Sequence, residues 1–129
     1  MRWLAFRIFH QRAEEQDLRF AIRESQAVQL IPLSGVTPVT GGPEALLGTL
    51  DFRGKTIKAF DLGSALGLGP GYLPQRARLL VVRQTRVSLP LAIAVQPELQ
   101  EAGSVDAKTM RQLDIRALAR LGQTRRGAG

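Results

Sequence analysis

Apolar and polar side chains alternate in several short stretches of this chain, a pattern typical of β-strands. Near the N-terminus, Leu4, Phe6 and Ile8 fall on one face of such a stretch, and Ala5 and Arg7 fall on the other. The alternation predicts a mainly β protein. Further strands are predicted over residues 18–22, 29–33, 78–83 and 86–95, with short helices over residues 23–28 and 43–47.

The predicted strand over residues 86–95 contains a proline. Val87, Leu89 and the alternating residues that follow would share one face, but Pro90 has no N–H to donate to a neighbouring strand. We therefore expect this strand at a sheet edge, or interrupted by a bulge.

Residues 48–67 carry the most specific pattern in the chain. They predict a strand, a tight Arg53-Gly54 turn, a second strand and one short turn of helix. Asp61 is placed to cap that helix and Gly67 to end it. The side chain of Arg53 is thereby predicted at the lip of a hairpin turn, where another protein can reach it.

The C-terminal region has a helical period. Met110, Leu113, Leu118 and Leu121 are spaced as on one helix face, which predicts a helix over residues 107–121 with Asp106 as its cap. We expect residues 122–129 to be a disordered tail, residues 10–17 to be a polar connection and residues 67–75 to be a loop at an internal boundary. No internal repeat is evident from the sequence.

Length and composition place the chain among single-domain globular proteins. It has 129 residues, of which 44% are hydrophobic, and no apolar run approaches the roughly 20 residues of a membrane span. The N-terminal stretch lacks the features of a signal peptide, and the absence of cysteine excludes disulfides and thiolate chemistry. We therefore expect a cytoplasmic protein that does not insert into a membrane.

The basic residues favour an acidic partner without identifying one. The net charge is +7, and the arginines are densest over residues 76–86 and 111–126. A small basic β-barrel that binds nucleic acid is therefore an alternative. Only 5% of the residues are aromatic, so no base-stacking platform is evident, and a solvated basic surface is favoured.

The chain lacks a recognisable catalytic motif. Its one histidine, His10, has no serine or aspartate partner in a known arrangement, and Glu14, Glu15 and Asp17 read as a solvated acidic loop. The glycines of residues 67–71 are not followed by the Lys-Ser or Lys-Thr of a phosphate loop. We expect no enzyme activity, no cofactor and no metal.

The order of these elements over residues 3–95, and above all the pattern of residues 48–67, resembles the CheW-like domain family. The resemblance implies two small SH3-like β-barrels of five strands packed side by side. It also implies a non-enzymatic scaffold in chemotaxis or another chemosensory pathway, with type IV pilus twitching motility as an alternative. The implied partners are the tip of a methyl-accepting chemoreceptor and the regulatory domain of a CheA-type histidine kinase.

The resemblance also implies a binding surface. Arg53 matches the arginine of the family's Asn-Leu-Arg-Gly turn, which lies close to the receptor contact, and Gly54 completes that turn. The apolar candidates for a receptor groove are also candidates for plain barrel core: Val28, Leu30, Val36 and Leu50. The sequence departs from the family at Asp51 and Phe52 before the arginine, at Lys58 in place of proline and at Gly63 in place of arginine.

The C-terminal half is shorter than the family pattern. About two strands are missing between Val95 and the closing strand and helix, for which the family alignment gives residues 110–113 and a helix capped by Asp114. The expectation is one domain over residues 1–121, with a first barrel mainly from residues 18–67 and an incomplete second one from residues 1–10 and 76–121. An incomplete barrel leaves a sheet edge open, and we expect either the first strand or a partner's strand to complete it, with self-association as one version of the latter.

Overall fold

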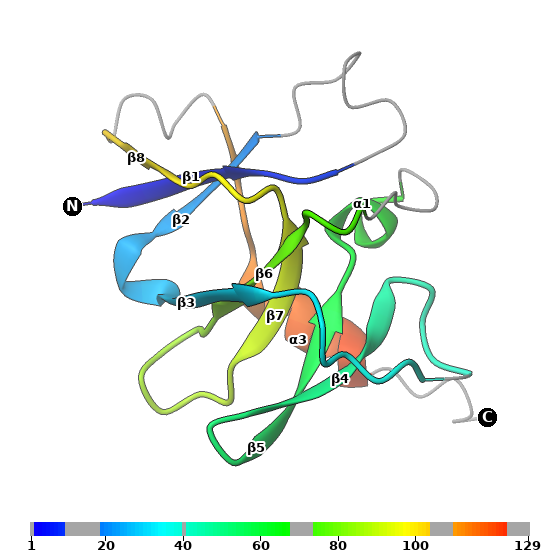
Figure 1. Ribbon diagram of the computed structural model, residues 1–129. Coiled ribbons are helices and arrows are strands. Elements are labelled where there is room, and N and C mark those ends of the chain that lie inside the picture. The colour runs from blue at the N-terminus through cyan, green and yellow to red at the C-terminus, as the bar shows by residue number, and fades with distance from the viewer. Residues whose placement is uncertain (1, 10–18, 40, 68–73, 104–109, 124–129) are drawn as a thin grey trace.

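The computed structural model describes residues 2–9, 19–39, 41–67, 74–103 and 110–123, which form two β-sheets with short helices (Figure 1). The predicted mainly β fold with a short C-terminal helix is confirmed. The elements are β1 (Trp3–Arg7), β2 (Arg19–Arg23), the 3-10 helix η1 (Glu24–Gln26), β3 (Ala27–Pro32), β4 (Leu46–Phe52), β5 (Lys55–Phe60), α1 (Leu62–Ala65), β6 (Arg78–Val82), β7 (Leu91–Val95), β8 (Gln100–Ala102), β9 (Arg111–Gln112) and α3 (Ile115–Gln123).

Strand pairing divides the strands of the described residues between two sheets. One sheet has four strands in the order β8-β1-β2-β9, and the other has five in the order β3-β6-β7-β5-β4. Strand β2 thus pairs with the N-terminal strand, while β6 and β7 join the strands of residues 27–60 (Figure 1). The two sheets interleave along the sequence because each takes strands from both halves.

A backbone bridge links the two edges of the five-stranded sheet. The chain that continues from β3 pairs with β4, because Thr37 and Thr49 exchange N–H···O bonds of 2.7 and 2.9 Å. Gly48 makes this approach feasible, since a Cβ atom there would lie 2.2 Å from the carbonyl oxygen of Thr37. The predicted special role of Gly48 is therefore a close backbone contact.

Two apolar clusters fill the molecule. The larger lies between the sheets and contains the stacked rings of Phe6 and Phe20, whose centroids are 5.7 Å apart, together with Ile115 of α3. The smaller lies on the other face of the five-stranded sheet. Strand β5 contributes to both, because its side chains alternate: Phe60 enters the larger cluster and Ile57 the smaller.

The structure reveals an internal repeat that the expectation from sequence missed. Strand β5 pairs parallel to β7 and leads through Asp61 into α1, while β9 pairs parallel to β2 and leads through Asp114 into α3. Residues 55–66 and 108–119 align in sequence without a gap. The matches are Lys55 with Lys108, Thr56 with Thr109, Ile57 with Met110, Lys58 with Arg111, Phe60 with Leu113, Asp61 with Asp114 and Leu62 with Ile115.

Three predicted elements are wrong in extent or type. Of residues 23–28, only Glu24–Gln26 form a helix, the 3-10 helix η1, and β3 begins at Ala27. Residues 43–47 are not a helix: one turn, in which the Leu46 N–H bonds to the Pro43 carbonyl at 3.0 Å, leads directly into β4. Strand β7 covers only residues 91–95, and it lies between β6 and β5 instead of at an edge. Pro90 ends the loop before the strand, so no ladder bond is lost there.

The helix predicted over residues 107–121 is also wrong, and the arrangement implied by the family alignment is found. The chain forms β9 and then α3, and the carboxylate of Asp114 accepts the N–H of Ala117 at 3.0 Å. The helix continues past Gly122 to Gln123. Asp106, the polar connection, most of the boundary loop and the rest of the tail lie outside the described residues.

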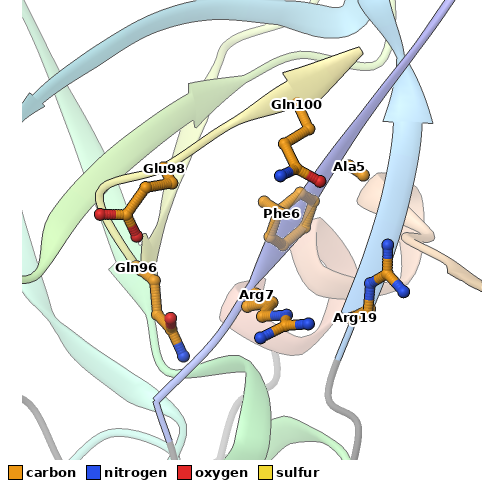
Figure 2. A pocket seen from close by; sticks show the side chains of 7 residues that line it. All are labelled: Ala5, Phe6, Arg7, Arg19, Gln96, Glu98 and Gln100. Carbon is orange, nitrogen blue, oxygen red and sulfur yellow. The ribbon is translucent and has the colours of Figure 1, made fainter. Parts of the chain in front are cut away.

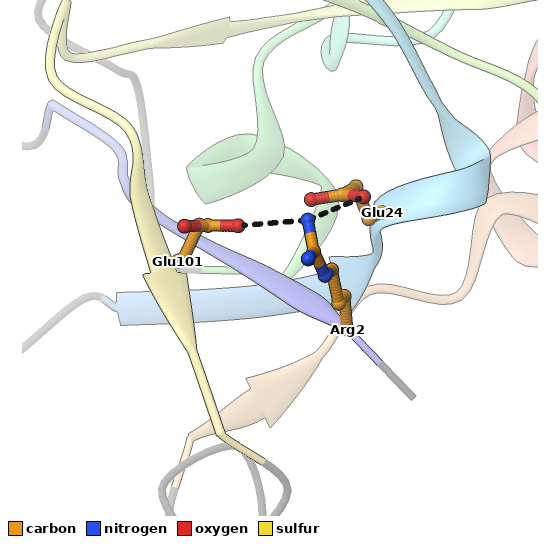
Figure 3. Close-up of polar contacts among 3 residues, drawn as sticks. All are labelled: Arg2, Glu24 and Glu101. Atoms are coloured by element: carbon orange, nitrogen blue, oxygen red, sulfur yellow. Dashed lines mark ion pairs between the residues drawn. The ribbon is translucent and has the colours of Figure 1, made fainter.

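Exposed ion pairs connect the N-terminus to both neighbouring segments. The guanidinium of Arg2 lies 4.0 Å from a carboxylate oxygen of Glu24 and 3.6 Å from one of Glu101 (Figure 3). The Arg2 side chain is 75% exposed, so solvent screens both pairs and each contributes little to stability.

Candidate functional site

The β4–β5 hairpin presents Arg53 at its tip. Arg53 and Gly54 have φ angles of 50° and 81°, which are the left-handed conformations of a two-residue type I′ turn. The Arg53 Nη2 atom donates a hydrogen bond of 2.9 Å to Oε1 of Gln29, and its guanidinium lies 4.8 Å from the ring centroid of Phe52. The charge is exposed and held in a defined position, as the sequence predicted for this turn.

The rest of the hairpin tip is polar and open. The hydroxyl of Thr56 donates to Oδ1 of Asp51 at 3.1 Å across the strand pair, and a Cβ placed on Gly54 would have no atom within 4 Å.

Asp61 precedes α1 but does not cap it as expected. Its buried carboxylate accepts the hydroxyl of Ser64 at 2.8 Å and makes no hydrogen bond to the helix backbone.

Three of the four apolar residues expected to form a receptor groove lie together, and the fourth lies apart from them. Val28, Val36 and Leu50 belong to the smaller cluster next to Phe52, whereas Leu30 packs against the larger cluster. A bulge in β3 between Ala27 and Gln29 causes the separation, because an extra residue reverses the facing of every later side chain. Strict alternation in the sequence would have put Val28 and Leu30 on the same face.

A large apolar cleft lies where the five-stranded sheet meets α3. This junction cleft has a volume of about 540 Å³. Buried Phe60, Leu91 and Ile115 contribute apolar lining, and Lys58 and Arg116 contribute charge. It is lined by Thr56, Lys58, Phe60, Gln84, Thr85, Ser88, Leu89, Pro90, Leu91, Ile115, Arg116 and Ala119.

The loop between β6 and β7 carries exposed apolar side chains beside this cleft. Val87 is 95% exposed and Leu89 is 61% exposed. The strand predicted over residues 86–95 includes both residues, so the sequence does not predict them as exposed loop residues. Pro90 was the available signal, since a proline at that position favours a loop before a short central strand.

A second hollow is small and polar. It has a volume of about 220 Å³ and lies beside β1 and the chain that follows β7 (Figure 2). Arg7 and Arg19 face each other across the β1–β2 ladder, and Glu98 lines the same hollow. The amide of Gln96 is committed to the fold, because its Nε2 donates to the Ile8 carbonyl at 3.2 Å.

The described part of the chain can be set against what a metal site and a membrane-spanning helix require. Its His, Cys, Asp and Glu side chains form no group of three or more able to hold a metal ion. Its helices are too short and too polar to cross a bilayer. His10 and the acidic residues 14–17 lie outside the described residues.

Comparisons with known proteins identify a family and a similar fold. A family model described as the CheW-like domain matches residues 7–124. The fold is similar to that of the scaffolding protein TtCheW from Thermoanaerobacter tengcongensis, with a TM-score of 0.60, 17% sequence identity and 78% of this chain covered. The match covers 62% of that protein, so this chain spans less of the fold than its neighbour does. No curated protein sequence matches the chain.

Proposed function

The chain belongs to the CheW-like domain family, and we propose that it is a non-enzymatic adaptor of a chemosensory pathway. In this role it bridges chemoreceptor tips and the regulatory domain of a CheA-type histidine kinase in the cytoplasm. The observation that carries the proposal is the exposed guanidinium of Arg53, which Gln29 and Phe52 orient at the tip of the β4–β5 hairpin, at the position of the arginine in the family's turn.

Arg53 has the properties of a contact residue. It is exposed, it forms no ion pair within the described part of the chain, and core packing does not explain its place in the turn. The contacts with Gln29 and Phe52 reduce the conformational entropy that binding would otherwise remove. A carboxylate on the partner can therefore meet a guanidinium that is already oriented.

The junction cleft supplies an apolar surface for the same function. An amphipathic helix docks its apolar face in a hydrophobic groove, and this cleft joins such a floor to exposed Leu89 at the rim. The basic side chains of Lys58 and Arg116 favour a helix with acidic flanking residues. We assign the receptor tip to this cleft in place of the groove expected from Val28, Leu30, Val36 and Leu50.

Binding measurements with matched variants test the proposal. Arg53→Ala should weaken binding of the receptor tip or the kinase regulatory domain at least tenfold in isothermal titration calorimetry. Arg76→Ala is the control, because Arg76 is an exposed arginine that lies 5.1 Å from the ring centroid of Phe9 and should not change binding. Unchanged binding of both partners by Arg53→Ala would remove Arg53 from the site.

A separate variant, Ala119→Trp, tests the junction cleft. Ala119 is exposed on α3 and lines the junction cleft, so Ala119→Trp fills the cleft without removing a core side chain. We expect this variant not to bind the receptor tip. Normal binding of the tip would show that the receptor docks elsewhere.

Nucleic-acid binding is the second candidate, and the net charge of +7 is the observation in its favour. It predicts binding of duplex or single-stranded probes that falls steeply as salt increases, because bound counterions are released from the phosphates. No gel shift at low salt would exclude it.

A further inference from the structure

The internal repeat shows which strand of the five-stranded sheet has no counterpart among the described strands of the four-stranded sheet. Gln29 pairs with Val81 and Val81 with Ala92 in one sheet, while Gln100 pairs with Ala5 and Ala5 with Ala21 in the other. The strand orders therefore correspond as β3-β6-β7-β5 and β8-β1-β2-β9. Strand β4 pairs with β5 at six positions, and no strand of the described residues takes the equivalent place beside β9.

The backbone of β9 presents hydrogen-bonding groups at this edge. The N–H of Leu113 donates to the carbonyl of Ala21 at 3.1 Å, so Leu113 faces β2. Because backbone groups alternate in direction along a strand, the N–H and C=O of Gln112 face away from β2. The equivalent residue of the other sheet, Ala59, is paired on that side with Gly48 of β4.

An apolar hollow adjoins the same edge. It has a volume of about 280 Å³ and lies between α1 and α3, the two helices of the repeat. Leu66, which is 43% exposed, opens it to solvent. The hollow is lined by Phe20, Leu62, Ala65, Leu66, Gln112, Leu113, Asp114, Ala117, Leu118 and Leu121.

The charges near the edge favour an acidic occupant. Within residues 110–123, Arg111, Arg116, Arg120 and Asp114 are all exposed, which leaves a net charge of +2 from three arginines and one aspartate. A second copy of this chain would bring another +7 and another short basic strand to the same place. Like charges facing each other across a strand pair are destabilising, so self-pairing at β9 is disfavoured.

We infer that the outer edge of β9 accepts an extended acidic segment of a partner protein as an added strand. Main-chain bonds to Gln112 fix the segment, and one of its apolar side chains enters the hollow between α1 and α3. Strand addition of this kind takes affinity from backbone bonds and specificity from a side-chain pocket. The inference is independent of the receptor and kinase contacts proposed above.

A synthetic peptide that alternates glutamate with leucine is the probe. Its binding to the full chain is followed by amide chemical shifts in NMR, which should change at Gln112 and around Leu66 and Ala117. Two control peptides are used: one carries N-methyl groups at alternate residues and cannot form the main-chain bonds, and the other has lysine in place of glutamate. Both should bind at least tenfold more weakly.

Two alanines of α3 provide matched variants. Ala117 and Ala119 are both exposed, but Ala117 lines the hollow beside β9 and Ala119 lines the junction cleft. Ala117→Trp should weaken peptide binding at least tenfold and leave the receptor tip bound, while Ala119→Trp should do the reverse. The two proposals can therefore fail separately.

Strand addition would be overturned if the peptide failed to bind, if its binding shifted amides away from β9, or if the N-methylated peptide bound equally well. A concentration-dependent dimer in light scattering with a protected Gln112 amide would show that a second copy is the occupant, and would overturn the choice of an acidic partner.

Discussion

The two sheets follow the same pairing plan and differ by one strand. In the five-stranded sheet, β4 covers the outer side of β5, and the Thr37–Thr49 bridge links it to the chain that leaves β3. In the four-stranded sheet, the corresponding strand β9 pairs at two positions only, and it has no described strand on its other side. The bridged sheet presents the exposed Arg53 turn, and among the described strands the outer edge of β9 is unpaired.

The largest effect on stability is expected at the Thr37–Thr49 bridge, which joins the two edges of the five-stranded sheet. Gly48→Ala would place a Cβ atom 2.2 Å from a backbone oxygen of Thr37, so β4 must move and the bridge must open. We expect the free energy of unfolding to fall by about 2–4 kcal/mol in urea denaturation. Gly103→Ala is the control, because its Cβ would have no atom within 4 Å and should change stability little. Equal stability of the two variants would mean that the closure contributes nothing.

A smaller effect on stability is expected from the N-cap of α3, which differs from that of α1. Asp114 caps α3 through the Ala117 N–H, whereas Asp61 bonds to a side chain at the equivalent position. Asp114→Ala should lower the free energy of unfolding by about 1 kcal/mol, since it removes an N-cap. Asp114→Asn should keep most of the stability, because asparagine caps equally well. Identical thermal unfolding of the wild type and the alanine variant would contradict the assigned cap.

The hairpin corner allows stability and binding to be separated. Asparagine tolerates the left-handed conformation better than arginine does, and Asn-Gly is favoured in type I′ turns. Arg53→Asn should therefore keep the free energy of unfolding within about 0.5 kcal/mol of the wild type in urea denaturation. Its binding of the kinase regulatory domain or the receptor tip should nevertheless fall as for Arg53→Ala. A large loss of stability would assign Arg53 to the fold and not to a contact.

A weak effect is expected for the exposed ion pairs that connect the N-terminus to η1 and β8. Arg2→Ala should lower the free energy of unfolding by only about 0.2–1 kcal/mol, because both pairs are exposed. The difference between wild type and variant should shrink as salt screens the charges. A salt-independent difference in urea denaturation would indicate lost packing instead of lost charge.

Local sequence patterns predicted several strands and the Arg53-Gly54 turn correctly. Alternation identified β1, β2, β5 and β6, and the Arg-Gly pair identified the turn, because these features depend on neighbouring residues. The bulge in β3 could not be read from alternation, so Leu30 was grouped with Val28. The junction cleft was missed for a similar reason, since it depends on α3 and a loop that are distant in sequence.

The C-terminal error has a different cause. Leu113, Ala117 and Leu121 fit a helical period, yet Leu113 lies in extended backbone that pairs with β2. The repeat of residues 55–66 in residues 108–119 was available in the sequence and would have placed a strand before Asp114. Sheet pairing decided the conformation there, and helical spacing alone could not show it.

Amide hydrogen exchange of the free protein at Ala59 and Gln112 tests the comparison most directly. These residues occupy equivalent positions in the two sheets, and within the described residues a strand lies on the outer side of Ala59 and none on that of Gln112. We expect the Ala59 amide to exchange slowly and the Gln112 amide to exchange at least a hundredfold faster. Equally slow exchange of the two amides would show that the edge of β9 is already covered, and would contradict the open sheet.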